Sequence, residues 1–315
     1  MGEVTSTTVV DPVSIGLPAS PLTAAGSDPP SVFVRARLDE QLRALLTSEA
    51  VARAGADPEG VHQMRVAVRR MRAAIKADGR HLPDGVRLQA ELRWLGSSLG
   101  AVRDLDVLLD HIHAQAAGFD AADAAALEQL VGGLVGDRRA ARRRMLTVLR
   151  GRRYRALRVA LAAAVTSPVV EVLDGGGPEP AELVDVVRKP LRRLVRRAAQ
   201  LGEDPPDDDL HELRIHGKRL RYAAELAEPA RPKRVGRLIR ATKRLQEVLG
   251  DHQDAVVAVE QVRRLLADFG PTADTRVAFV AGRLIELERA KRAEQRAAWR
   301  AAVDEVAAAG AKITD

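Results

Sequence analysis

The chain has no cysteine among its 315 residues. This absence excludes disulfide bonds, thiolate catalysis and cysteine-based zinc sites. Aromatic residues are also scarce, at 3%, although hydrophobic residues as a group reach 46%. The hydrophobic residues are mainly alanine, leucine and valine. Such a composition is typical of packed helices rather than of β-sandwiches, which favour aromatic and β-branched side chains.

Long apolar runs are missing as well. No stretch of about 18 apolar residues occurs, so the sequence predicts no membrane span. The N-terminus lacks a basic stretch followed by an apolar one, so it does not resemble a signal peptide. From these features we expect a soluble protein of the cytoplasm.

Basic residues outnumber acidic ones, 50 to 43, which gives a net charge of +7 and a pI of about 10.2. A basic balance indicates the kind of partner rather than the fold. Nucleic acid, an anionic membrane and other polyanions all remain possible. The positions of the basic residues must therefore decide between them.

Hydrophobic periodicity is helical from Ser31 onward, and no alternating strand pattern follows it. The sequence predicts an all-α fold with helices over 31–55, 57–79, 85–112, 120–158 (one helix or two), 181–202, 210–227, 232–269 and 272–309. Residues 1–30 are predicted to be a flexible tail or linker, since they are rich in Ser, Thr, Gly and Pro. Residues 166–180, which contain three successive glycines, are the predicted linker between two bundles, 31–165 and 181–310. Each bundle should contain about four helices.

The segment 62–76 predicts an amphipathic helix with one cationic side. Asp57 followed by Pro58 is a typical helix start. At roughly 100° per residue, one stripe contains His62, Arg65, Arg69, Arg72 and Lys76, and another contains Met64, Val68, Met71 and Ile75. The apolar stripe should face a core, and the cationic stripe should face a partner.

The segment 211–221 repeats this pattern. The alignment pairs His62 with His211, Arg65 with Arg214, Arg69 with Lys218, Arg70 with Arg219, and Arg72 with Arg221. Downstream it pairs Leu99-Gly100 with Leu249-Gly250, and Asp104 with Asp254. Two copies predict a duplicated bundle with a pseudo-two-fold axis, whose cationic stripes face each other across a basic central cavity or pore.

Further basic residues near these helices complete the predicted site. They are Arg93, Arg103, Arg192, Arg196, Lys243 and Arg244. The carboxylates Asp104, Asp106 and Asp254 are predicted to orient arginines or histidines rather than to bind a metal, and no cofactor is expected. The role of Asp106 cannot be symmetric, because it aligns with Val256. By contrast, the basic residues of 283–296 alternate with glutamates, which is typical of an exposed face with i,i+4 pairs.

The two helix starts, VHQMRVAVRRMR and LHELRIHGKRLR, are each followed by an aspartate-containing segment, LGAVRDLDV and LGDHQDAVV. Together they resemble the CHAD family, the histidine-containing α-helical domain, over residues 31–305. The resemblance implies two similar helical bundles around a basic cavity that binds inorganic polyphosphate. It also implies a triphosphate tunnel (CYTH) domain as a frequent partner. The ExExK motif of that tunnel domain is absent here, so we expect binding and no enzymatic activity.

Three functions are compatible with these patterns. The leading one is polyphosphate binding, because each stripe repeats a charge about every 5 Å; such binding would target the protein to polyphosphate granules. Nucleic-acid binding is the first alternative, but two Trp, two Tyr and four Phe offer few stacking platforms. An enzyme of phosphate metabolism is the second, although the sequence contains no P-loop. Protonation of His62 and His211 should strengthen binding as the pH falls.

Overall fold

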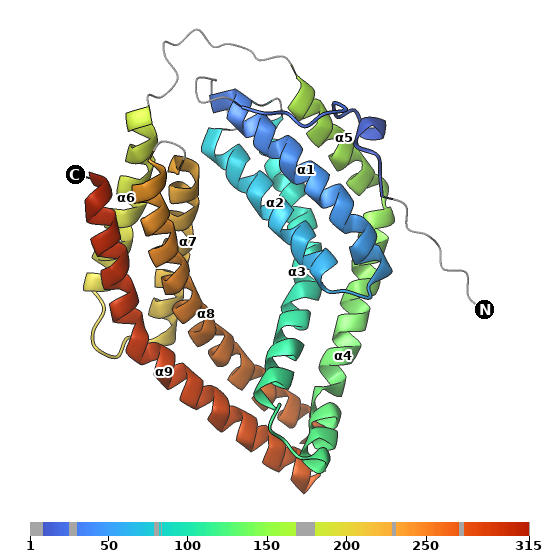
Figure 1. Cartoon of the computed structure of the whole chain (residues 1–315). Coiled ribbons are helices and arrows are strands. Elements are labelled where there is room, and N and C mark those ends of the chain that lie inside the picture. The colour runs from blue at the N-terminus through green and yellow to red at the C-terminus, as the bar shows by residue number, and fades with distance from the viewer. Residues whose placement is uncertain are drawn as a thin grey trace. The chain divides into compact units, whose positions relative to one another are not determined.

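The computed structural model describes residues 9–24, 30–78, 82, 84–167, 180–228, 231–270 and 274–314. Every regular element in these residues is helical, which confirms the predicted all-α class (Figure 1). The elements are a 3₁₀ helix η1 (Pro12–Ile15) and the α-helices α1 (Pro30–Ala54), α2 (Glu59–Asp78), α3 (Gly85–Gln115), α4 (Ala121–Arg150), α5 (Arg152–Thr166), α6 (Pro180–Ala199), α7 (Asp207–Ala227), α8 (Pro232–Phe269) and α9 (Thr275–Thr314). None of these helices combines the length and the apolar character that crossing a bilayer requires.

Local signals explain where the helices begin and end. Asp57 Oδ1 accepts the backbone N–H of Glu59 at 2.8 Å, which confirms the predicted start of α2. The segment 120–158, for which the sequence left one helix or two open, forms two helices. The break is at Gly151, whose backbone is extended (φ −72°, ψ 157°).

The chain divides into two compact units. Unit 1 contains residues 1–109 and 134–177, and unit 2 contains residues 110–133 and 178–315. Helices α3 and α4 therefore each belong to both units. Segment 110–133, which the sequence pattern grouped with the first bundle, belongs to unit 2. Its His111 bonds Glu288, and its Asp123 accepts from Arg283. Most of the predicted linker, 168–179, lies outside the described residues.

Unit 1 is built around α1, which lies side by side with α2 and with α5 (Figure 1). Leu38, Leu42 and Leu45 of α1 are completely buried, as helical spacing predicts for an inward face. Tyr154 of α5 joins the same core. Together these helices hold one face of α2 against apolar neighbours.

Part of the predicted N-terminal tail packs on unit 1, which corrects the prediction of a flexible segment. Leu17 is buried in the core of unit 1. The carboxylate of Asp39 accepts the backbone N–H of Leu22 at 2.7 Å, and Arg43 donates to the carbonyl of Pro18 at 2.6 Å. The segment 9–24 is thus held by a buried leucine and by polar groups of α1, an arrangement that its turn-rich composition does not reveal. Residues 1–8 and 25–29 lie outside the described part of the chain.

Besides segment 110–133, unit 2 is built from α6, α7, α8 and α9. Helix α8 lies beside both α7 and α9, and α6 packs on α7 and α9. The core contains Trp299, which is 1% exposed, among leucines and valines of all four helices. This core holds the apolar face of α7, as unit 1 holds that of α2.

Candidate functional site

Helix α2 turns its apolar side into the core of unit 1 and leaves its basic side outside. The buried residues are Met64, Val68, Met71 and Ile75, as predicted. Burying one such side chain stabilises the fold by about 1.5–3 kcal/mol. Of the cationic stripe, Arg69 and Lys76 are exposed, and His62, Arg65 and Arg72 are half-buried. The core therefore sets which way the stripe points.

Arg65 reaches from α2 to α3. Its Nη1 lies 3.2 Å from Asp104 Oδ1, and 38% of the arginine side chain remains exposed. A Cβ atom at Gly100 would collide with the guanidinium of Arg65. Gly100 thus makes room for Arg65, and Asp104 orients it while leaving donors available to a partner.

His62 stands beside Arg103 of α3. Burial lowers the pKa of His62, and the nearby positive charge of Arg103 lowers it further, whereas Glu59 raises it. The imidazole is therefore neutral at pH 7. A polyanion bound at this position would raise the pKa of His62.

The other predicted residues of unit 1 differ in their exposure and in their hydrogen-bond and ion-pair partners. Arg69, Arg70, Lys76 and Arg93 are exposed and form no ion pair with another described residue. At roughly 100° per residue, Arg70 points about 120° away from the centre of the stripe. The Nε of Arg72 is buried and has no hydrogen-bond acceptor among the described residues. Unit 1 thus presents several cations whose charge is not compensated.

Helix α7 repeats the division in unit 2. Its buried residues include Leu210, Leu213, Gly217, Leu220 and Ala224. Of the predicted residues, His211 and Arg219 are exposed, and Arg214, Lys218 and Arg221 are half-buried. Like Arg70, Arg219 points about 120° away from the stripe.

The matched neighbours in unit 2 have a different chemistry. His211 Nδ1 hydrogen-bonds Gln253 Oε1 at 2.8 Å, at the position where unit 1 has Arg103. Arg214 lies close to Gly250. Its neighbour Asp254 has a pKa raised by burial, an effect that Arg214 and His111 oppose. Asp254 forms no ion pair among the described residues, so it does not orient Arg214 as Asp104 orients Arg65.

Two predicted cations of unit 2 already have anionic partners. Arg221 donates from Nε to Glu225 at 2.7 Å and also bonds Gln246. Arg244 pairs with Glu305 of α9. Lys243, Arg192 and Arg196 are exposed, without an ion pair to a described residue. The structure therefore leaves some of these cations available and neutralises others.

The predicted orienting carboxylate Asp106 contacts an arginine, but one that lies outside the predicted site. It is 3% exposed and pairs with Arg138 of α4 rather than with a residue of either stripe. The pair joins α3 to α4 within unit 1. Arg138 was missing from the predicted site, and nothing in its local pattern distinguishes it from the arginines around it.

The prediction of an ordinary exposed face on α9 is wrong for Arg292 and Arg296. Both donate to Asp207 of α7, at 2.8 and 2.7 Å, and His252 Nε2 lies 3.2 Å from the same carboxylate. Glu288 of α9 is buried and bonds His111 at 2.6 Å. These charges pair between helices, because α9 packs beside α8 and brings them to partners far away in the sequence. No cluster of side chains suited to a metal ion occurs among the described residues.

Comparison with other sequences identifies the family. Residues 36–263 match the model of the CHAD domain. The chain is 31% identical over 246 residues to uncharacterized protein MT2285 of Mycobacterium tuberculosis strain CDC 1551, a match that covers 75% of this chain and 46% of the relative. Uncharacterized protein Rv2226 of strain H37Rv matches equally. The matched region thus spans about half the length of these curated relatives.

Similarity to solved structures also points to the CHAD fold. The CHAD domain from the plant Ricinus communis superposes with a TM-score of 0.71 and 32% identity, over 91% of this chain and 95% of that one. PptA from Streptomyces chartreusis superposes with a TM-score of 0.63 and 20% identity, over 87% and 99%, and supports the fold alone. The chain therefore belongs to the CHAD domain family.

Proposed function

We propose that this protein binds inorganic polyphosphate through the cationic faces of α2 and α7, without transforming it. One observation carries the proposal. Both helices bury their apolar side and leave arginines and lysines outside the core, several of them unpaired. Polyphosphate offers only repeated negative charge, so its recognition requires cations at short, regular intervals.

Unit 1 supports the proposal most strongly. The α2 stripe and the neighbouring residues of α3 together contain six permanent cations and one carboxylate, Asp104. The cations are Arg65, Arg69, Arg72, Lys76, Arg93 and Arg103. Each charge-assisted contact is worth about 1.5–3 kcal/mol. Several such contacts give tight binding that weakens strongly with salt, as for proteins that bind the phosphates of DNA.

The proposal extends to the arrangement of the two halves. Under it, the chain is an internal duplication, and a pseudo-two-fold axis directs the stripes of α2 and α7 towards one basic central cavity or pore. The alignment of His62 with His211 and of Arg65 with Arg214 supports this arrangement. The bound polymer would then localise the protein to polyphosphate granules in the cytoplasm, and a triphosphate tunnel domain protein would be a natural partner.

A competition experiment tests the ligand. Long-chain polyphosphate should displace duplex DNA and RNA from the protein at equal phosphate concentration, because aromatic residues that could stack on bases make up only 3% of the chain. Incubation with Mg²⁺ or Mn²⁺ should release no phosphate. Preferential retention of nucleic acid would contradict the proposal, and steady release of phosphate would indicate an enzyme.

A matched pair of double variants tests the site. Arg65→Glu with Arg214→Glu should abolish polyphosphate binding while the helical circular dichroism is retained. Arg143→Glu with Arg264→Glu makes the same change in net charge at exposed, unpaired positions away from both stripes. Equal losses in the two double variants would show that net charge alone matters.

A further inference from the structure

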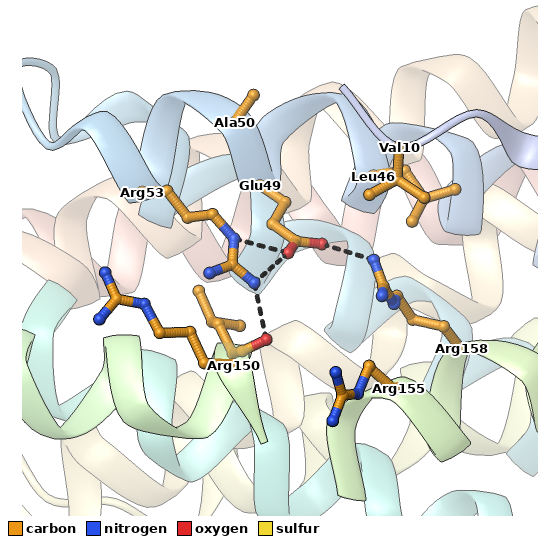
Figure 2. Close-up of a pocket in the computed structure, with 9 residues that line it drawn as sticks. Val10, Leu46, Glu49, Ala50, Arg53, Arg150, Arg155 and Arg158 are labelled. Atoms are coloured by element: carbon orange, nitrogen blue, oxygen red, sulfur yellow. Dashed lines mark hydrogen bonds and ion pairs between the residues drawn. The ribbon is translucent and has the colours of Figure 1, made fainter. Parts of the chain in front are cut away.

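A second basic site lies in unit 1, away from the stripes. It is a pocket of about 460 Å³ between α1 and the junction of α4 with α5 (Figure 2). Its lining consists of Val10, Leu46, Glu49, Ala50, Arg53, Leu149, Arg150, Arg155 and Arg158. None of these residues belongs to the stripe of α2, so the pocket is not explained by the proposed polyphosphate site.

A buried carboxylate holds two of the arginines in place. Glu49 is 3% exposed and accepts hydrogen bonds from Arg53 at 2.6 and 2.8 Å and from Arg158 at 3.2 Å. The phenol of Tyr154 donates to the same carboxylate at 2.7 Å. Arg53 also donates to the carbonyl of Leu149 at 2.6 Å. Figure 2 shows the two guanidinium groups on either side of Glu49. They are ordered before any ligand arrives, which lowers the entropic cost of binding.

The positive charge of the pocket is not balanced. Four arginines line it against one carboxylate. Arg150 and Arg155 are exposed and form no ion pair with a described residue. Arg158 has a buried Nε with no hydrogen-bond acceptor among the described residues. A lining group that lacks an acceptor, together with three excess charges, calls for an anion with several acceptor oxygens.

The remaining walls are apolar. Val10, Leu46, Ala50 and Leu149 complete the lining, and the volume falls in the range of roughly 300–1,000 Å³ typical of small-molecule sites. A polyphosphate chain has no apolar part to place against them. We propose that this pocket binds a small organic phosphate, whose phosphate contacts the arginines and whose apolar part lies against Leu46 and Ala50.

Calorimetry with phenyl phosphate and inorganic phosphate tests the proposal on the full chain. Phenyl phosphate should bind more tightly than inorganic phosphate. Arg150→Ala with Arg155→Ala should weaken its binding at least about tenfold, because two charge-assisted contacts are lost. Arg143→Ala with Arg144→Ala removes the same charge from exposed positions of α4 that do not line the pocket. This control should leave binding unchanged.

The outcomes separate the two sites. Equal losses in both double variants, or equal affinity for the two phosphates, would overturn the pocket proposal. Absence of phenyl phosphate binding by the unmodified protein would overturn it too. Arg65→Glu with Arg214→Glu should retain phenyl phosphate binding even as polyphosphate binding fails. Arg150 and Arg155 are exposed and unpaired, so circular dichroism should show that the Arg150→Ala with Arg155→Ala variant remains folded.

Discussion

Helices α2 and α7 differ most in the residues that surround a matched pair of arginines, Arg65 and Arg214. In unit 1, Arg65 lies directly over Gly100 and pairs with Asp104 at 3.2 Å. In unit 2, Arg214 lies farther from Gly250, and Asp254 forms no ion pair. The same sequence pattern thus positions one arginine firmly and leaves the other less constrained.

The charge around His62 also differs from the charge around its counterpart His211. His62 has the cation Arg103 beside it, whereas His211 bonds the neutral Gln253. Lys76 aligns with Glu225, which neutralises Arg221. The α2 stripe and its neighbours therefore carry more uncompensated positive charge than the α7 stripe and its neighbours. A repeated motif therefore does not imply equal binding, and the α2 stripe is the stronger candidate for the polyphosphate contact.

Removal of matched cations should give the largest contrast. Arg69→Ala with Arg93→Ala in unit 1 should weaken polyphosphate binding about 100-fold, since two arginine contacts are lost. Lys218→Ala with Lys243→Ala in unit 2 should cost about tenfold, because lysine offers a single point of charge. Titration at one fixed salt concentration measures both. Equal losses would contradict the asymmetry.

Exchanging the residue beside each histidine, Arg103 or Gln253, should reduce the difference in binding between the two stripes. Arg103→Gln should weaken binding several-fold and raise the pKa of His62 towards its ordinary value of 6.5, since a nearby positive charge is removed. Gln253→Arg should strengthen binding through the added cation. Affinity measurements and NMR titration of the histidine rings provide the readouts. An unchanged pKa of His62 in Arg103→Gln would show that Arg103 does not lower it.

The two glycines should respond differently to alanine. Gly100→Ala would displace the guanidinium of Arg65 and should reduce polyphosphate affinity a few-fold. Gly250→Ala meets Arg214 at 3.7 Å, an ordinary contact. It should leave affinity unchanged and stabilise α8 by up to about 1 kcal/mol. Chemical denaturation and binding assays would check the pair, and a loss of affinity in Gly250→Ala would argue against this account.

The smallest effect concerns pH. The pKa values of His62, His216 and His252 all lie below the ordinary 6.5, chiefly because of burial. Below pH 6.5 the unfolded chain binds protons first, so the free protein should lose stability as the pH falls towards the folded-state pKa values.

Bound polyphosphate should reverse part of this trend at His62, because it favours the protonated ring. Melting temperatures at pH 7.5 and 5.5, with and without polyphosphate, would show both effects. His62→Gln should reduce the gain that polyphosphate gives at the lower pH. A melting temperature of the free protein that rises on acidification would contradict the first expectation.

The sequence by itself determined the all-α class and the faces that α2 and α7 bury. Caps such as Asp57 act over a few residues, and helical periodicity assigns Met64 to the core and Arg69 to the surface. The two repeated motifs were also enough to indicate the CHAD family. The expectation of polyphosphate as the ligand came from that family resemblance, and it stays a prediction.

Only the tertiary structure decided which charges are paired. Arg244 meets Glu305, Arg138 meets Asp106, and Arg292 meets Asp207 across long stretches of chain. The arginines are chemically alike, so no local pattern can select a partner for each of them. The same reason hid the pocket around Glu49 and the packing of residues 9–24, because both depend on which helices lie side by side.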